Sequence, residues 1–216
     1  MESIEKKDNP TWSIIGWTFI LSMAYAILRY HIAGPVPWKD LSFFILNKGI
    51  SLCAYILLVF NFTFGPLKNI GFPVPNSWMR SRRLIGIVSF ILVLLHVFMS
   101  FMLFNPANYA KFFEDNGTMT LIAGLSMFMG LLAFVFLWMY NISFSSEIRK
   151  DKDLIGFITS RKVLLTVMLF GGAHLIIMGW KGWMNPGGWH GGLPPISLIA
   201  VIFFVIGFIV NMFGRK

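Results

Sequence analysis

The composition of this 216-residue chain excludes a soluble globular domain. Hydrophobic residues make up 56% of the chain and charged residues only 12%, where soluble domains average about 25%. The formal net charge is +9, but the basic residues form no soluble basic domain, so the sequence predicts no nucleic-acid partner. The composition predicts an all-α, polytopic membrane protein embedded in a lipid bilayer.

Six apolar stretches are long enough to cross a bilayer, because an α-helical span needs about 20 such residues. They lie near 11–29, 41–65, 84–104, 118–141, 163–183 and 193–213, and none contains Asp or Glu. The first is longer than a signal-peptide core and is followed by no small-residue cleavage site, so we expect it to be retained. Short connections predict antiparallel neighbours in a six-transmembrane-helix bundle, a single domain over residues 1–216.

The basic residues predict the orientation, since they accumulate on the cytoplasmic side of membrane proteins. With the amino terminus in the cytoplasm, the outer side receives only Arg29, Lys39, Lys111 and Lys181, and Lys48 lies inside the second span. We therefore expect a multi-pass protein of the cell (inner) membrane with both termini cytoplasmic. The remaining basic residues all fall on the cytoplasmic side: Lys6, Lys7, Lys68, Arg80, Arg82, Arg83, Arg149, Lys150, Lys152, Arg161, Lys162, Arg215 and Lys216.

The cysteine count limits the redox chemistry that the chain can support. A single cysteine, Cys53, excludes an intrachain disulfide, a four-cysteine iron–sulfur cluster and the CxxCH attachment of covalent haem. The connection at 142–160 is too short for a flavin or nicotinamide domain, and no glycine-rich dinucleotide fingerprint occurs. Any reducing power must come from a partner protein or a lipid-soluble carrier.

Two of the four histidines, His96 and His174, lie inside predicted spans. His96 follows Arg83, and His174 follows Arg161, by the same number of residues, so each lies about 20 Å along its helix from the cytoplasmic arginine. Both helices run outward, which predicts one shared level in the outer half of the bilayer. Ionisable groups inside a membrane are functional candidates, although a lone histidine is more simply explained by a hydrogen bond between helices.

Small residues border both histidines. Ser89 belongs to a stripe of small or weakly polar residues on the His96 face, and Gly171 begins the sequence GGAH that ends at His174. Two histidines at one level, each with space beside it, fit a porphyrin whose iron is bound from both faces. The residues thus predict one non-covalent, bis-histidine haem b with iron bound by His96 and His174.

Two lysines are candidate partners for the haem propionates. Lys48 lies roughly 10 Å deep in its span, where no acidic side chain is available, and Lys181 follows His174 on the same helical face. Snorkelling of either ammonium to the outer surface is the alternative. His31 and His190 fall on the outer side, either as solvated loop residues or as part of a metal or quinone site.

The sequence RRLIGIVSFILVLLH, at 82–96, resembles the third-span signature of the ferric reductase-like transmembrane domain family. It is most similar to the haem-binding membrane subunits of bacterial methionine sulfoxide reductase systems, in which paired arginines, a Leu/Ile-Gly step and a haem-ligand histidine follow in this order. GTMTLIAGLSMFMGLLAFVFLWMYNIS and SRKVLLTVMLFGGAHLIIMGW resemble the fourth and fifth spans. The resemblance implies that His174 is the other outer haem ligand.

The chain departs from this family at the inner ligand positions. Relatives with a second haem or a third histidine carry an inner ligand about 13 or 14 residues before each outer one, and here Arg82 and Arg161 occupy those positions. Arginine does not replace histidine as a haem ligand. The resemblance therefore implies one outer haem, and it favours oxidation of a quinol in the bilayer, or electron delivery at the outer face, over a relay from the cytoplasm.

The predicted function is that of a membrane-embedded b-type cytochrome. It would pass electrons from a quinol or a redox partner protein to an acceptor at the outer face, as an electron-transfer (oxidoreductase) subunit with quinone as a compatible second cofactor. One alternative is an extracytoplasmic ferric or metal reductase component. The other is a haem-free transporter or assembly subunit, which the absence of intramembrane carboxylates disfavours.

Overall fold

The computed structural model describes residues 10–143 and 145–214, and helices are the only regular elements in this part of the chain. The predicted all-α bundle of a multi-pass membrane protein is confirmed. Lys6, Lys7, Arg215 and Lys216, which contributed to the predicted orientation, lie outside the described residues. Within the described ranges, six helical segments are long and apolar enough to cross a membrane: Thr11–Ile32, Trp38–Asn69, Asn76–Leu103, Leu121–Ile142, Lys152–Trp183 and His190–Phe213.

These segments are built from six long helices, two short ones and several single turns. The long helices are α1 (Thr11–Ile27), α2 (Leu46–Asn69), α3 (Asn76–Leu103), α5 (Leu121–Ile142), α7 (Arg161–Trp183) and α8 (Ile196–Phe213). The short ones are α4 (Pro106–Tyr109) and α6 (Lys152–Ile158). A π-helical turn at Leu28–Ile32 extends α1, and another at Leu41–Ile45 precedes α2. Short 3-10 turns lie at Trp38–Asp40, Ala110–Phe112, Ile148–Lys150, Pro186–Gly188 and His190–Gly192.

Capping residues set where several helices begin. The Thr120 hydroxyl accepts a hydrogen bond from the Ala123 amide at the start of α5, and Ser160 caps α7 in the same way. α3 begins at Asn76, before the predicted start of its span at residue 84. The additional first turns are rich in arginine, so they do not appear in the hydropathy of the sequence. Hydropathy detects only the part of a helix that lies in hydrocarbon.

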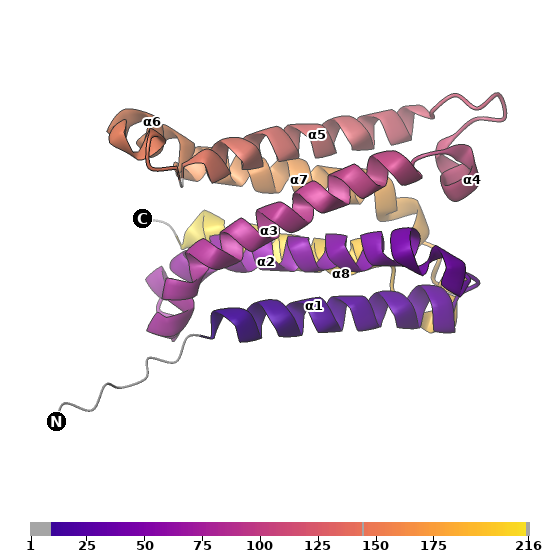
Figure 1. The fold of residues 1–216 in the computed structure, drawn as a ribbon, viewed down its shortest axis with the longest axis horizontal. Helices are drawn as coiled ribbons and strands as arrows, with labels where there is room; N and C mark the ends of the chain where they lie inside the picture. The colour runs from indigo at the N-terminus through magenta and orange to yellow at the C-terminus, as the bar shows by residue number, and fades with distance from the viewer. Residues whose placement is uncertain (1–9, 144, 215–216) are drawn as a thin grey trace.

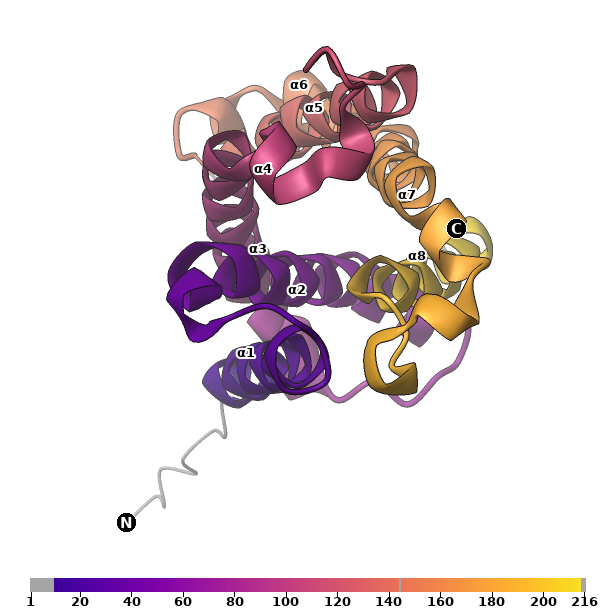
Figure 2. The ribbon, with the colours of Figure 1, turned by 90° about the vertical axis from the view of Figure 1, so that its right-hand side faces the viewer.

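Five of the long helices surround the interior of the bundle. Viewed along the bundle, α2, α3, α5, α7 and α8 follow one another around the centre, and α1 packs outside against α2 (Figure 2). α2 packs closely on α3, and α5 on α7, whereas α3 and α5 meet only briefly because α3 crosses the others diagonally (Figure 1). α8 contacts both α2 and α7 and so joins the two helix pairs.

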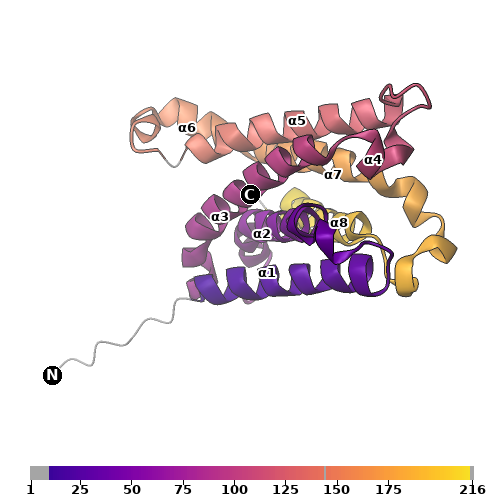
Figure 3. The same ribbon diagram turned by 45° about the vertical axis from the view of Figure 1, so that its right-hand side comes forward.

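The two ends of the bundle differ. One end, named here the α4 end, carries α4 and the 3-10 turns after α7 (Figure 3). The other, the α6 end, carries α6, the start of α1 and the end of α8 (Figure 1). Because α1 starts and α8 finishes at the same end, the described chain crosses the bundle an even number of times.

Large apolar side chains cover the outside of the bundle. Examples are Leu121 (78% exposed), Phe98 (64%), Ile206 (56%) and Leu131 (53%), which belong to α3, α5 and α8. Soluble proteins rarely expose so many large apolar side chains, whereas helices that face lipid present such a surface to the hydrocarbon. The surface therefore supports the lipid bilayer as the environment of the protein.

The interior towards the α6 end is filled by apolar side chains. Gly172 lets α8 approach α7, because a Cβ atom at this glycine would lie 2.5 Å from the Phe204 ring. Such close packing leaves no room for a planar cofactor between these two helices at that level. The cluster combines residues of α2, α5, α7 and α8: Leu58, Phe62, Leu137, Leu164, Val167, Met168 and Phe204.

Candidate functional site

His96 is held by α2, the helix next to its own. Its Nδ1 donates a hydrogen bond to Asn47 Oδ1 at 2.7 Å. Asn47 is only 2% exposed, and its amide nitrogen donates to the Ser100 hydroxyl at 3.2 Å. Both the oxygen and the nitrogen of the Asn47 amide are therefore hydrogen-bonded, and the bond from the oxygen fixes the rotation of the His96 ring.

His174 is held in the same way by α5. Its Nδ1 lies 2.7 Å from the backbone oxygen of Ser126. A carbonyl oxygen can only accept a hydrogen bond, so the ring proton sits on Nδ1. The Ser126 hydroxyl donates to the His174 carbonyl at 3.2 Å, and the ring lies so close to Gly130 that a Cβ there would be 2.9 Å from Nδ1.

Both histidines thus present the same atom for binding. With the proton on Nδ1, the Nε2 of a neutral imidazole carries a free lone pair. Across residues 10–143 and 145–214, neither Nε2 has a hydrogen-bond partner, and both rings are only half-buried. His96 comes from the α2–α3 pair and His174 from the α5–α7 pair, and the rings are close enough to interact electrostatically. Two imidazoles from separate helix pairs therefore each keep one ring nitrogen without a hydrogen-bond partner in the described ranges, near enough for their charges to interact.

Lys48 follows Asn47 on α2 and lies near both histidines. Its half-buried side chain places Nζ 4.8 Å from the centre of the Tyr109 ring and 5.2 Å from that of Phe44. The ammonium is close enough to act electrostatically on both imidazoles. No carboxylate pairs with Lys48 in the described part of the chain, where the ion pair found is between Lys150 and Glu147.

The small residues predicted to border a porphyrin lie in helix contacts. Ser89 is fully buried, and its hydroxyl donates to the Gly86 carbonyl at 2.9 Å. Gly86, on the same face of α3, approaches the Asn61 side chain of α2 so closely that a Cβ would lie 2.8 Å from its amide nitrogen. Gly171 faces the Tyr55 ring, 3.5 Å from the position of a Cβ. A role for Ser89 and Gly171 beside a cofactor stays a prediction.

The two arginines at the inner ligand positions are used to join helices. Arg82 Nε donates to the Asn61 carbonyl of α2 at 2.9 Å, and the Arg161 guanidinium donates to the Met212 carbonyl of α8. The apolar cluster described above fills the interior towards this end. Neither guanidinium offers a ligand to a metal at the α6 end.

The other two histidines do not join the interior pair. His31 donates through Nδ1 to the Val36 carbonyl at 2.7 Å, and its ring lies 3.8 Å from that of Trp38, so it stabilises its own turn. His190 starts the 3-10 turn His190–Gly192. No three His, Cys, Asp or Glu side chains gather as a possible metal site in the described ranges.

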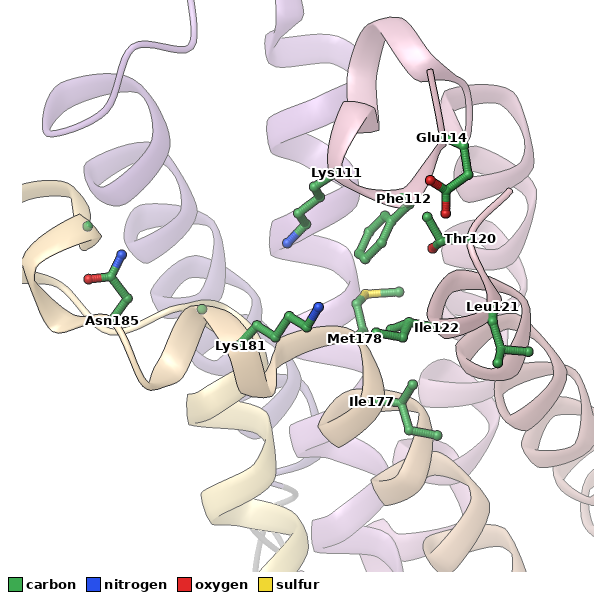
Figure 4. Close-up of a pocket in the computed structure, with 12 residues that line it drawn as sticks. Lys111, Phe112, Glu114, Thr120, Leu121, Ile122, Ile177, Met178, Lys181 and Asn185 are labelled. Atoms are coloured by element: carbon green, nitrogen blue, oxygen red, sulfur yellow. The ribbon is translucent and has the colours of Figure 1, made fainter. Parts of the chain in front are cut away.

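A pocket of about 580 Å³ opens at the α4 end, between the start of α5 and the end of α7 (Figure 4). Lys181 lies in this pocket, next to Lys111 from the segment after α4. Its lining combines charged, polar and apolar residues: Lys111, Phe112, Glu114, Thr120, Leu121, Ile122, Ile177, Met178, Lys181, Gly182, Asn185 and Gly188.

Three residues of this region were not predicted as site residues: Asn47, Ser126 and Lys111. Asn47 carries a signal, because a polar amide directly before Lys48 is unusual in an apolar span. Ser126 carries almost none, since its backbone oxygen is the group that binds His174 and any residue has one. Lys111 is far from the other lysines in sequence, and only folding brings it to Lys181.

Comparison with known proteins identifies no relative: no protein-family model matches the chain, and no curated protein matches it. The resemblance to the ferric reductase-like family therefore stays a prediction. The chemistry of this protein has to be inferred from the paired histidines, their hydrogen bonds and the charges around them.

Proposed function

We propose that this protein is a membrane b-type cytochrome that binds one haem between His96 and His174 and delivers electrons at one face of the membrane. One observation carries the proposal: two imidazoles, from separate helix pairs, are each bonded through Nδ1 and leave Nε2 free. Metal-binding histidines typically have this arrangement, because the bond at one nitrogen fixes the tautomer that leaves the other nitrogen as the ligand.

The donor set fits haem, because neutral imidazole nitrogens are common protein ligands of haem iron, and His96 and His174 would hold it. Bound haem would supply one-electron redox chemistry. The protein residues hold and tune it: Asn47 and the Ser126 carbonyl orient the two rings and raise their basicity as ligands, and the surrounding apolar helices exclude water.

A single haem is favoured over two stacked haems. The interior towards the α6 end is filled by apolar side chains, and Arg82 and Arg161 are bonded to backbone carbonyls there. One haem near the α4 end is too far from the other membrane face for a simple relay. We therefore propose a quinol in the bilayer, or a redox partner protein, as the electron donor, and an acceptor at the α4 end.

A reduced-minus-oxidised absorption spectrum of the purified protein tests this function. A bis-histidine haem b is expected to give sharp α and Soret bands on reduction, with about one haem extracted per chain. The protein must be expressed with sufficient haem supply, and reconstitution with added haem serves as the control. A protein that stays colourless after reconstitution would refute the cytochrome and favour the haem-free alternative.

We propose Lys48 as the partner of a haem propionate, because its ammonium has no carboxylate in the described chain and acts on both imidazoles. Lys48→Met is expected to lower the haem midpoint potential, since removing positive charge near the iron favours the ferric state. The expected change is on the order of 30 mV, or about 0.7 kcal/mol for one electron.

A redox titration at matched pH, with haem content checked, measures this change. Lys39→Met is the matched control, because Lys39 lies in the exposed turn Trp38–Asp40 and is expected to leave the potential unchanged. A potential that is equal or higher in the Lys48 variant would remove Lys48 from the haem environment.

We propose that the α4 end faces away from the cytoplasm and both termini lie inside, because the arginines of α3 and the basic residues around α6 gather at the α6 end. A cysteine placed at Gly187 is expected to react with an impermeant maleimide from outside intact cells, and one at Ser146 only after lysis. Both positions are exposed, and the native Cys53 is fully buried and silent. The reverse labelling pattern would invert the orientation.

A further inference from the structure

The pocket at the α4 end lies directly above the His174 site. Ile177, Met178 and Lys181 follow His174 by three, four and seven residues, so all four share one face of α7. Across the gap, Ile122 precedes Ser126 by one turn of α5. The pocket floor is therefore about one helical turn, roughly 5 Å, from the His174–Ser126 contact.

The charges of this pocket are unbalanced. Lys111 and Lys181 extend their ammonium groups towards the same space from opposite sides, whereas Glu114 points elsewhere and lies beside Thr120 (Figure 4). Neither lysine has an ion-pair partner in the described chain. Lys48 is not part of the lining, but its positive charge is close enough to repel that of Lys111.

Two features of its surroundings act on the charge of Lys111. Part of its side chain is exposed, but Nζ lies 4.7 Å from the centre of the Phe112 ring. Desolvation there, together with repulsion from Lys48, lowers the pKa of Lys111 below the usual lysine value. A bound anion would offset this repulsion.

Five of the other lining residues have large apolar side chains. Phe112, Leu121, Ile122, Ile177 and Met178 supply contacts for a hydrocarbon or aromatic body. The volume of about 580 Å³ lies within the range of about 300–1,000 Å³ found for small-molecule sites.

We propose that this pocket binds a small organic anion from the aqueous phase at the α4 end, with its carboxylate between Lys111 and Lys181 and its apolar body against α5 and α7. This ligand goes beyond the proposed haem and does not depend on it, because binding needs only the pocket.

Binding of radiolabelled 2-naphthoate to the full chain in phosphatidylcholine nanodiscs tests the proposal. Equilibrium dialysis, corrected for empty discs, should give saturable binding that the neutral isostere 2-naphthamide does not displace. The double variant Lys111→Gln/Lys181→Gln should bind on the order of tenfold more weakly, as expected for two partly exposed charges. Glu114→Gln should bind about twofold more tightly, because it removes the repelling charge.

Lys39→Gln is the matched control, as an exposed lysine of the same end outside the pocket. Equal affinity of the wild type and the double variant, or displacement by 2-naphthamide as effective as by unlabelled naphthoate, would overturn the proposal. Retained haem binding in the double variant would separate this failure from a failure of the cytochrome function.

An anionic lipid headgroup offers the same charge from a different source. The assay is therefore repeated in discs that contain phosphatidylglycerol. Naphthoate affinity that is unchanged by this lipid supports the aqueous anion. Competition by the lipid that depends on Lys111 and Lys181 would reassign both lysines to the membrane surface and overturn the inference.

Discussion

Replacing His96 or His174 with alanine is expected to remove most of the haem from the purified protein, because each change deletes one of the two proposed iron ligands. Each ring bonds to the protein through Nδ1, whereas Nε2 has no hydrogen-bond partner in the described structure and is the nitrogen available to iron. Haem content per chain, measured by pyridine haemochrome spectra after gel filtration, is the direct measurement. His190→Ala is the matched control and is expected to retain haem.

Loss of haem could also follow from a misfolded bundle, and a second variant separates the two causes. His174→Met keeps a ligand for iron and is expected to retain haem with a raised midpoint potential, since methionine ligation favours ferrous haem. Full haem content in both alanine variants, with unchanged spectra, would remove these histidines from the site.

Asn47→Leu is expected to weaken haem binding by about 10- to 100-fold while leaving both histidines in place, because it removes the acceptor for the His96 ring proton. Without that bond the ring is free to rotate, and it becomes a weaker donor to ferric iron. The midpoint potential should therefore rise, opposite in sign to the change expected for the adjacent Lys48→Met. Haem titration of the haem-free protein and a redox titration measure the two effects.

Asn141→Leu is the matched control, because Asn141 is an amide at the α6 end of α5 and is not among the hydrogen-bond partners of either histidine ring. It is expected to change neither the affinity nor the potential. A normal affinity and potential in Asn47→Leu would show that the Asn47–His96 bond serves helix packing alone.

The sequence by itself determines the membrane architecture. Each helical crossing of the bilayer needs about 20 apolar residues, so every span can be recognised from its own stretch of sequence, without knowledge of the other spans. The apolar core of every predicted span is helical in the structure. Hydropathy predicts the helix bounds less accurately. The first turns of α3 are polar, and the capping residues Thr120 and Ser160 set the starts of α5 and α7.

The two histidines could be selected from the sequence as well. An imidazole in an apolar helix has a desolvation cost, so its presence alone marks a residue that needs a partner. What the sequence could not supply was that partner. The bond from His174 goes to a backbone carbonyl, which every residue possesses, and its acceptor was decided by the register of α5 against α7.

Tertiary structure alone decided which small and basic residues meet. Gly171 and Gly172 both precede His174, yet packing places one against Tyr55 and the other against Phe204. Lys111 joins Lys181 only because the chain after α4 folds back over the end of α7. Such contacts depend on helix rotation and crossing angle, and these are set by the complementary shapes of two surfaces, which no single segment of sequence contains.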